Sequence, residues 1–334
     1  MKSELIDKFG RKHNYLRISL TDKCNFNCTY CNPNNHMSYS VKKSNLLTYE
    51  EILRMMHLFA DNHGFNKFRF TGGEPFARKG LMDFFKNVKF LKDKFGFKTG
   101  ITTNGSLLKG NCSGLFSAGI DNLNISLDSL NMENFNKITG KNYFQYVISA
   151  IDEAIEAGYT NIKINCVVIK NSNDNELVDF VNFAIAKNLN VRFIEYMPFG
   201  NNDWQNNGFV SYNEMFNFIS NHFKLIPAKN NNNNVAKDFL IEGHNGVISF
   251  ISSISQHFCG SCNRLRVSSD GKIRVCLFTN GNSELNIKEM FRDGYSDNDI
   301  SDELIKLLNE KWEKHPGVTE LRALKENNMF KIGG

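Results

Sequence analysis

Short runs of alternating apolar and polar residues recur between Tyr15 and about residue 197, and longer stretches with helical periodicity separate them. Runs of this kind predict strands, and the stretches between them predict amphipathic helices. The six predicted strands are YLRISLT (15–21), KFRFT (67–71), KTGITT (98–103), NLNISLD (122–128), IKINCVVI (162–169) and VRFIEYM (191–197). Strands and helices that alternate in this way form a parallel sheet covered by helices.

The clearest helical pattern begins at Thr48, in the stretch TYEEILRMMHLFADNHG. Thr48 and Glu51 have the spacing of a capping box, in which each side chain bonds the backbone N–H of the other residue. Gly64 is a suitable residue to end this helix. The apolar residues on one face of this helix are Ile52, Met55, Met56 and Phe59.

Two architectures fit six β/α units, a partial (β/α)6 barrel of the TIM type and an open doubly wound sheet. The barrel is favoured because polar motifs follow strand after strand: TGGEP (71–75), TTNG (102–105), Ser126 and EYMP (195–198). The loops after the strands build the active sites of (β/α) barrels. We therefore predict an α/β fold with a partial (β/α)6 barrel whose chemistry gathers at one rim.

An asparagine-rich tract, KNNNNNVAK (229–237), has the composition of an exposed linker or loop. We place a domain boundary near it, with the barrel in residues 1–225 and a smaller C-terminal domain in residues 226–334. In the second domain the sequence predicts strands within DFLIEGHNGVISFISSIS (238–255) and a helix over DISDELIKLLNEKWEKH (299–315).

The composition is that of a globular chain with a sizeable core. Of 334 residues, 41% are hydrophobic and 22% are charged, and no apolar run approaches the ~18 residues of a membrane span. The N-terminal MKSELIDKFGRKHNYLR lacks the apolar segment of a secretory signal, so we expect a soluble, cytoplasmic protein with reduced thiols. A net charge of +5 would help to attract a phosphorylated small molecule, but it falls short of the basic stripe of a nucleic-acid binder.

Six of the eight cysteines form two sets of three. The first cysteine set, Cys24, Cys28 and Cys31, has C-x3-C-x2-C spacing directly after the first predicted strand. A structural zinc site normally uses four ligands, and His36 is the only further candidate nearby. Three cysteines on a compact loop instead favour a [4Fe–4S] cluster with one iron left open to a substrate or cosubstrate.

The second cysteine set, Cys259, Cys262 and Cys276, has C-x2-C-x13-C spacing. Taken alone, it fits a zinc site with His257 as the fourth ligand. Beside an N-terminal cluster, a second [4Fe–4S] cluster whose open iron binds the substrate is favoured. The remaining Cys112 and Cys166 are interpreted as ordinary helix and strand residues.

The first cysteine set, with Tyr30 before its last cysteine and GGEP at 72–75, resembles the radical S-adenosylmethionine (SAM) superfamily. The resemblance implies that SAM binds the open iron through its amino and carboxylate groups. It also implies that an electron from the cluster cleaves SAM to a 5′-deoxyadenosyl radical.

Further motifs resemble, within that superfamily, the GTP 3′,8-cyclases that begin molybdenum cofactor biosynthesis. The similarity covers almost the whole chain, and the most specific part is NRLR between the cysteines of the second set. The motifs are LRISLTDKCNFNCTYC, RFTGGEP, ITTNG, NISLDSL, ITG, RFIEYM, CGSCNRLRVSSDGKIRVCLF and the terminal IGG.

This resemblance assigns site residues. The residues implied to bind SAM are Tyr30, Gly73, Ser126 and Met197. The residues implied to bind GTP are Arg17, Arg69, Thr102, Lys163, Arg264, Leu265 and Arg266. Guanidinium groups suit phosphate oxygens, and three of these arginines are also assigned a catalytic role, the stabilisation of a developing intermediate: Arg17, Arg264 and Arg266. For each residue alone, a solvated surface charge or core packing is the alternative interpretation.

The implied reaction converts GTP to (8S)-3′,8-cyclo-7,8-dihydroguanosine 5′-triphosphate. The deoxyadenosyl radical removes the 3′ hydrogen of GTP, and the resulting carbon radical attacks C8 of guanine. The implied partners are a low-potential electron donor, a downstream cyclic pyranopterin monophosphate synthase and a second copy of the chain in a homodimer. The terminal FKIGG is expected either to enter the active site or to be a frayed tail.

Two other functions fit parts of the sequence. A radical SAM peptide maturase with an auxiliary cluster shares the first cysteine set but usually has more C-terminal cysteines. A non-catalytic iron–sulfur electron carrier or a zinc-stabilised binding module would need neither the GGEP turn nor the set of cations.

Overall fold

The structure is a computed structural model. It describes residues 3–31, 41–199, 202, 204, 208–228, 235–278 and 283–323. Three features singled out in the sequence lie outside these residues: His36, the asparagines at 230–234 and the terminal FKIGG.

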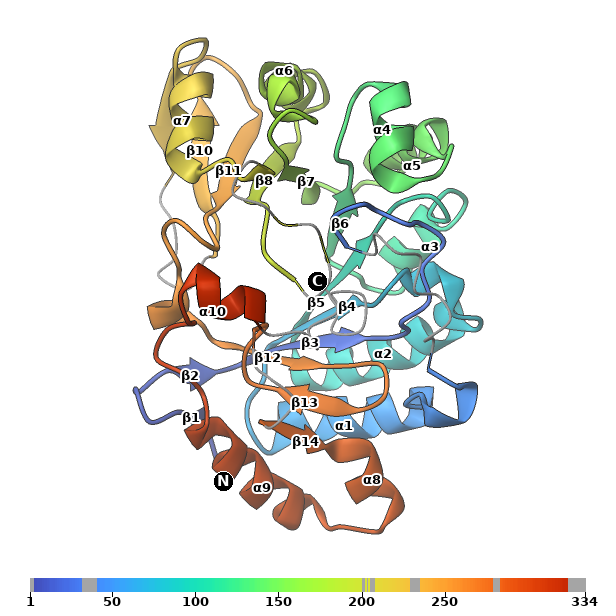
Figure 1. Cartoon of the computed structure of the whole chain (residues 1–334). Coiled ribbons are helices and arrows are strands. Elements are labelled where there is room, and N and C mark those ends of the chain that lie inside the picture. Colours follow the sequence, from blue (N-terminus) through green and yellow to red (C-terminus); the bar gives the residue numbers. More distant parts are fainter. Residues whose placement is uncertain are drawn as a thin grey trace.

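The predicted parallel sheet forms the centre of the molecule. Its six strands are β3 (Tyr15–Ser19), β4 (Lys67–Thr71), β5 (Lys98–Thr103), β6 (Asn122–Ser126), β7 (Ile162–Val168) and β8 (Asn190–Glu195). They lie side by side in chain order, and each pairs parallel with the next. Figure 1 shows them curved into an incomplete ring. The predicted partial (β/α)6 barrel is therefore confirmed.

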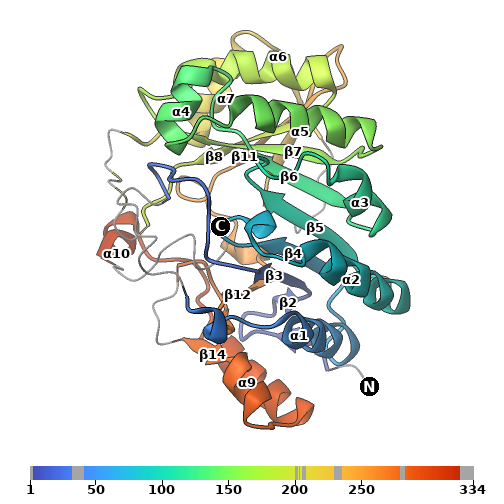
Figure 2. The same ribbon diagram turned by 90° about the vertical axis from the view of Figure 1, so that its right-hand side faces the viewer.

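Helices cover the outer face of this curved sheet, as Figures 1 and 2 show. They are α1 (Tyr49–Asp61), α2 (Leu81–Phe95), α3 (Cys112–Ser117), α4 (Met132–Thr139), α5 (Phe144–Glu156) and α6 (Leu177–Lys187). Alternate strand residues such as Leu16, Phe68 and Ile101 are fully buried in one core with these helices. Because side chains alternate along a strand, the residues between them face the inside of the barrel.

The first helix shows how the local pattern determines its bounds. Thr48 Oγ1 accepts a bond from the N–H of Glu51 at 3.2 Å, and Glu51 Oε2 accepts one from the N–H of Thr48 at 2.8 Å. The predicted capping box is thus confirmed. The helix ends at Asp61, and Gly64 follows with φ +68°. The predicted apolar face, which includes Phe59, is buried.

The C-terminal part of the chain continues the same sheet at both edges (Figure 1). On one side β11 (Val247–Ile251) pairs parallel with β8, followed by β10 (Lys237–Ile241) and β9 (Leu225–Pro227). On the other side β12 (Arg264–Val267) pairs parallel with β3. Two further antiparallel strands follow there: β13 (Lys272–Arg274) and β14 (Glu284–Asn286).

The sheet therefore contains twelve strands within the described residues. The predicted strands within 238–255 correspond to β10 and β11 and are confirmed. The boundary between residues 225 and 226 stays a prediction, and it falls inside β9.

The remaining elements lie around these strands. They are the hairpin strands β1 (Leu5–Ile6) and β2 (Lys12–His13), the helices α7 (Tyr212–Ser220), α8 (Ile287–Arg292), α9 (Asp297–Asn309) and α10 (Val318–Ala323), and the short 3-10 turns η2 (Lys43–Asn45), η3 (Pro75–Ala77), η4 (Asp174–Glu176) and η6 (Cys259–Ser261). In the described part of the chain, no helix combines the length and the apolar character that crossing a bilayer requires.

The helix predicted over 299–315 is wrong at its C-terminal end, because α9 ends at Asn309. Pro316 has no N–H to bond the carbonyl of Trp312, and it disfavours the helical conformation of the residue before it. The carbonyls of Trp312 and Glu313 bind the guanidinium of Arg11 instead.

Candidate functional site

The first cysteine set lies on the loop after β3, at the carboxyl end of the barrel. Its three thiols are free and half-buried. Cys24 Sγ accepts hydrogen bonds from the N–H of Phe26 at 3.4 Å and from Asn104 Nδ2 at 3.8 Å. The N–H of Cys31 donates to the carbonyl of Cys28 at 3.0 Å. A backbone and an amide donor thus bond one sulfur of the set, and a backbone hydrogen bond closes the turn between the other two cysteines.

Burial raises the pKa of each thiol in this set. The pKa of Cys24 is raised to about 11 and that of Cys31 to about 12, and the pKa of Cys28 lies well above its ordinary value. Thiolates at these positions thus need positive charge close by, which a metal centre bound on the loop would supply. The donor set fits an iron–sulfur cluster.

The loop is attached to α4 by two backbone hydrogen bonds. Asn27 N–H donates to Thr139 O and Thr29 N–H donates to Ile138 O, both at 2.9 Å. These bonds end at the ITG motif, so in this chain that motif anchors the loop of the first cysteine set.

The GGEP turn after β4 lies against the segment that leads into Cys24. Gly73 N–H donates to Thr21 O and Glu74 N–H donates to Lys23 O, both at 2.7 Å. A Cβ atom on Gly73 would lie 2.3 Å from Lys23 O, so any larger residue would push the two segments apart. The turn brings Gly73, a predicted SAM contact, next to the first cysteine set.

Glu74 is a site residue that the sequence analysis did not identify. Its fully buried carboxylate accepts bonds from Thr103 Oγ1 at 2.8 Å, Asn104 N–H at 2.7 Å and Phe76 N–H at 3.1 Å. Burial raises the pKa of Glu74 to about 7 against these three bonds. Since Asn104 in turn contacts Cys24, Glu74 positions the TTNG loop against the cysteines. The position of Glu74 inside the GGEP motif is the sequence feature that could have identified it as a site residue.

Tyr30 contacts the segment that follows β6, the strand that ends at Ser126. Tyr30 Oη donates to Asp128 Oδ2 at 2.8 Å, and Ser126 is the last residue of that strand. Asp128 also accepts a bond from Val167 N–H at 2.9 Å. Asp128, which the sequence analysis did not identify, therefore joins the first cysteine set to the strand that bears Ser126.

Three predicted GTP contacts lie in register on neighbouring strands. Arg266 of β12 pairs with Arg17 of β3, and Arg17 pairs with Arg69 of β4. All three face the inside of the barrel. The predicted contact Leu265 lies between Arg264 and Arg266, and its fully buried side chain packs in the helix-facing core.

The guanidinium of Arg69 is held in a space that a glycine leaves open. It donates to Tyr15 Oη at 2.9 Å and to Ile101 O at 3.2 Å. A Cβ atom on Gly100, the residue opposite Arg69 on β5, would lie 2.8 Å from its Nη2. Although burial alone would raise it, the pKa of Tyr15 is lowered to about 7 by Arg69 and Arg17.

Arg192 joins these cations, and the sequence analysis missed it. Its Nε and Nη2 donate to Asn165 Oδ1 at 3.0 and 2.6 Å. Burial and the charge of Arg69 lower the pKa of Arg192 to about 9. Burial, Arg192 and Arg69 likewise lower the pKa of Lys163 to about 8. The signal was the period-two pattern of VRFIEYM, which places Arg192 on the inner face. We call Arg17, Arg69, Lys163, Arg192 and Arg266 the inner cation group.

Two buried polar atoms beside this group have no hydrogen-bond partner among the described residues. They are Thr102 Oγ1 and Asn124 Oδ1, which lie opposite each other on β5 and β6. Buried polar atoms are normally paired, and like charges packed together are unfavourable unless an anion accompanies them. The interior of the barrel is therefore suited to an anionic ligand that also has polar groups.

The second cysteine set lies near the inner cation group. Its thiols line one cavity of about 60 Å³ together with Met197, Arg264 and Arg266. The predicted SAM contact Met197 thus lies at the second set. Although burial alone would raise it, the pKa of Cys262 is lowered to about 6 by Arg264 and Lys311. This cationic setting favours a thiolate ligand, so the residues fit a metal centre.

His257, the alternative fourth ligand, also lines this cavity. Its ring centroid lies 5.4 Å from that of His315. Among the described residues, no three His, Cys, Asp or Glu side chains converge on one ion-sized position. Cys112 and Cys166 are buried in α3 and β7, which confirms them as helix and strand residues.

Two protein families match the chain. The radical SAM superfamily matches residues 18–184, and the family described as Molybdenum Cofactor Synthesis C matches residues 189–317. A curated relative from Petrotoga mobilis, named GTP 3',8-cyclase, is 40% identical over 99% of this chain and 100% of its own length. One from Dictyostelium discoideum, named Molybdenum cofactor biosynthesis protein 1, is 41% identical over 98% of this chain and 52% of its own length.

The chain thus spans about half the length of several curated relatives and the whole length of another. Among solved structures, Streptococcus suis SuiB bound to S-adenosylmethionine has a TM-score of 0.62 at 16% identity. The similarity covers 88% of this chain and 69% of that chain. At so low an identity it supports the fold alone.

Proposed function

The chain belongs to the radical SAM superfamily and, within it, to the family of the GTP 3′,8-cyclases, and from this premise we propose that it converts GTP to (8S)-3′,8-cyclo-7,8-dihydroguanosine 5′-triphosphate. The observation that carries the proposal is the inner cation group, in a chain that also has two three-cysteine sets. Five buried or half-buried cations in one barrel suit a triphosphate, which carries several negative charges.

The first cysteine set would hold a [4Fe–4S] cluster and leave one iron for SAM. With SAM bound, this centre supplies a 5′-deoxyadenosyl radical. Gly73 and Ser126 would bind SAM at the rim, since the GGEP turn and the end of β6 both lie beside the set. Tyr30 and Asp128 would fix the loop against that rim. Met197 would contact SAM from the side of the second set.

The second cysteine set would hold a second [4Fe–4S] cluster with a position open to GTP. Arg264 and Leu265 would bind GTP on that side, the latter through its main chain. Arg17, Arg264 and Arg266 would in addition stabilise the intermediate as charge develops on the nucleotide.

The inner cation group would bind the triphosphate and orient the ribose toward the first set. Thr102 Oγ1, unpaired among the described residues, would bond the nucleotide. GTP would then lose its 3′ hydrogen to the 5′-deoxyadenosyl radical and close a bond from C3′ to C8, and one electron from the low-potential donor with one proton would complete the dihydro product. The protein contributes the fixed position of both reactants and the exclusion of water.

The wider setting is part of the same proposal. A low-potential electron donor would supply reducing equivalents, and the product would pass to a cyclic pyranopterin monophosphate synthase. A homodimer and a C-terminal tail in the active site stay predictions, the tail because it lies outside the described residues.

The test is anaerobic reconstitution with iron and sulfide, followed by incubation with GTP, SAM and a low-potential reductant. We expect 5′-deoxyadenosine to form only when GTP is present, together with a cyclised nucleotide. Replacing GTP by ATP is the substrate control, and Cys24→Ala should abolish both products. Deoxyadenosine formed without GTP and without a cyclised nucleotide would contradict the proposal and leave a different radical SAM reaction.

A further inference from the structure

Lys311 is a lysine with 2% of its surface exposed, just beyond the end of α9. Its ammonium group donates to Cys262 Sγ at 3.7 Å, Arg264 O at 3.1 Å and Val275 O at 2.6 Å. An ammonium group has three N–H donors, so all of them are used. Its contribution to the site described so far is the lowering of the pKa of Cys262, which it shares with Arg264.

The three acceptors belong to the two chain segments that carry the second cysteine set. Cys262 is itself a member, and Arg264 O lies two residues beyond it. Val275 directly precedes Cys276, the member from the other segment. A single buried group therefore connects the segment of the first two cysteines to that of the third.

Among the residues that the structure describes, the charge of Lys311 has no carboxylate partner. In the part of the chain that the structure describes, no Asp or Glu oxygen lies within 4.0 Å of its nitrogen. The nearby charged groups that act on it are Cys262 and Cys276, with Arg11 and Arg264 of the same sign. A buried ammonium needs a compensating negative charge, and here thiolate sulfur is the available source.

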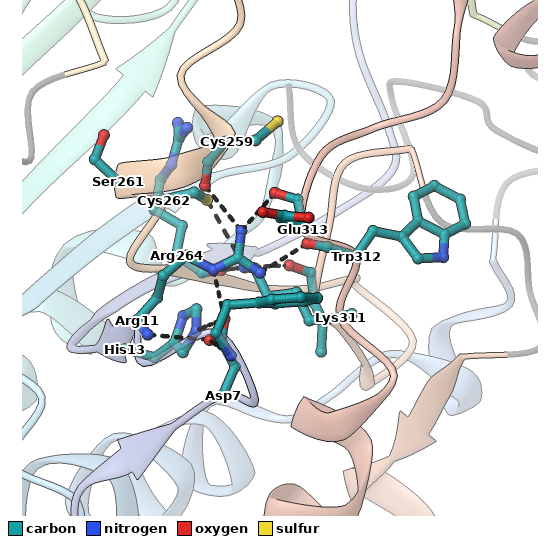
Figure 3. Close-up of polar contacts among 12 residues, drawn as sticks. Asp7, Arg11, His13, Cys259, Ser261, Cys262, Arg264, Lys311, Trp312 and Glu313 are labelled. Atoms are coloured by element: carbon teal, nitrogen blue, oxygen red, sulfur yellow. Dashed lines mark hydrogen bonds and ion pairs between the residues drawn. The ribbon is translucent and has the colours of Figure 1, made fainter.

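Arg11 offers a comparison, because it binds the same region with its charge already compensated. Its guanidinium donates to Cys259 O at 2.8 Å, Trp312 O at 2.7 Å and Glu313 O at 2.9 Å, and its Nε donates to Asp7 Oδ2 at 2.6 Å. Figure 3 shows both cations converging on the cysteine segment from opposite ends of the chain.

We propose that Lys311 is a positioning residue of the second iron–sulfur centre, which holds the two cysteine segments together and compensates the negative charge of the cluster. The proposal rests on the proposed function, because it requires that the second cysteine set bind a cluster. A cluster held by thiolates gains negative charge on reduction, and hydrogen bonds to its sulfurs help to set its potential. Lys311 should therefore raise the potential and slow the loss of iron.

The test uses the full chain with Cys24, Cys28 and Cys31 replaced by alanine, so that only the second centre remains. Lys311→Met removes the charge and keeps the apolar stem, Lys311→Gln keeps a neutral donor, and Lys311→Arg keeps the charge. The matched control is Lys306→Met, which removes an exposed lysine of α9 paired with Glu303. Each protein is reconstituted anaerobically. Iron, zinc and sulfide per chain, the rate of iron loss to a chelator and the midpoint potential by electron paramagnetic resonance are then measured.

We expect Lys311→Met to lose iron about tenfold faster than the parent and to titrate at a lower potential. In both the midpoint potential and the rate of iron loss, Lys311→Arg should lie nearer the parent than Lys311→Gln. Lys306→Met should match the parent in both. If Lys311→Met loses its cluster during reconstitution, the proposal is tested by comparing the midpoint potentials of Lys311→Gln and Lys311→Arg with that of the parent.

Two different failures are distinguishable. A parent chain that binds zinc, or no iron, at the second cysteine set would overturn the two-cluster function itself. An iron–sulfur centre whose potential and iron loss are the same in Lys311→Met and Lys311→Gln as in the parent would overturn the role of Lys311 alone. A purely structural role is excluded if the potential shifts while the thermal unfolding temperature does not.

Discussion

Individual residues in the barrel act by leaving space as much as by carrying charge. Gly73 allows two segments to approach at the first cysteine set, and Gly100 leaves room for the guanidinium of Arg69. At neither position is a left-handed backbone required, so the constraint is the missing side chain. Substitutions there test the site without removing a functional group.

Replacement of Gly100 by alanine should weaken GTP binding. The added Cβ would lie 2.8 Å from Arg69 Nη2 and 3.0 Å from its Cζ, so the guanidinium must shift from the position in which it bonds Tyr15 and Ile101. Loss of one charge-assisted contact corresponds to roughly tenfold in affinity. We expect the Kd for GTP to rise about tenfold, as measured by equilibrium dialysis.

The control for this substitution is Gly317→Ala. Its Cβ would meet no atom of the described residues within 4 Å, and its φ lies outside the left-handed range. GTP affinity should be unchanged in this variant. Equal affinity in Gly100→Ala and the parent would show that the position of Arg69 does not matter for the nucleotide.

Sequence motifs identified the site residues whose chemistry requires a fixed spacing. They did not identify the residues whose role depends on a contact with a distant part of the chain. The cysteines and Arg17 stand in recognisable motifs. Glu74, Asp128 and Arg192 were missed because their roles depend on contacts 27 or more positions away. Leu265 was included through its neighbours, and strand alternation turns its side chain to the core.

At the scale of elements, the N-terminal hairpin of β1 and β2 is attached to the second cysteine set by buried polar groups. Asp7 accepts bonds from Arg11 Nε at 2.6 Å and from His13 Nε2 at 3.0 Å, and Arg11 reaches Cys259 O. Both side chains of the Asp7–His13 pair are fully buried. A change in the charge of this group therefore affects the hairpin and the cysteine segment together.

The hairpin should make folding stability depend on pH through His13. Burial, with the charges of Lys311 and Arg11, lowers the pKa of His13 from 6.5 to about 4, against the opposing effect of Asp7. Between these values the unfolded chain binds a proton that the folded chain does not, so stability falls as the pH falls from about 6.5 to about 4. The loss should reach about 3 kcal/mol.

The measurement is urea unfolding of the iron-free chain at about pH 7 and about pH 4.5. His13→Gln keeps an N–H donor for Asp7 and removes the titration, so its stability should change less over this interval. The difference between the two proteins isolates His13 from other titrating groups. Parallel pH profiles would show that His13 is protonated equally in the folded and unfolded chain.

Elements with a strong local pattern were predicted well. The bounds of β4 and β5 match the sequence prediction, and the other four barrel strands differ by one or two residues at one end or, for β8, at both. Local periodicity could not predict β12, because its parallel partner β3 lies about 250 positions earlier. The end of α9 was missed for a similar reason, since Arg11 takes the carbonyls that a longer helix would use.

At the scale of the whole molecule, the C-terminal part of the chain covers both edges of the barrel sheet. β11 pairs with β8 at five positions, and β12 pairs with β3 at four. Exposed edges of this kind offer unpaired N–H and C=O groups to other chains. The predicted boundary after residue 225 would therefore cut through one continuous sheet. It would not separate two units that fold independently.

A fragment of residues 1–225 should consequently aggregate when it is expressed alone. It would expose the edges of β3 and β8, together with the apolar strand residues that the C-terminal strands cover. Size-exclusion chromatography and urea unfolding would measure this, with the full chain as reference. Co-expression with residues 226–334 is the matched control, since pairing at both edges should restore a soluble complex. A monomeric fragment with a cooperative unfolding transition would instead mean that the barrel closes its edges unaided, and the C-terminal strands would then serve the second cysteine set alone.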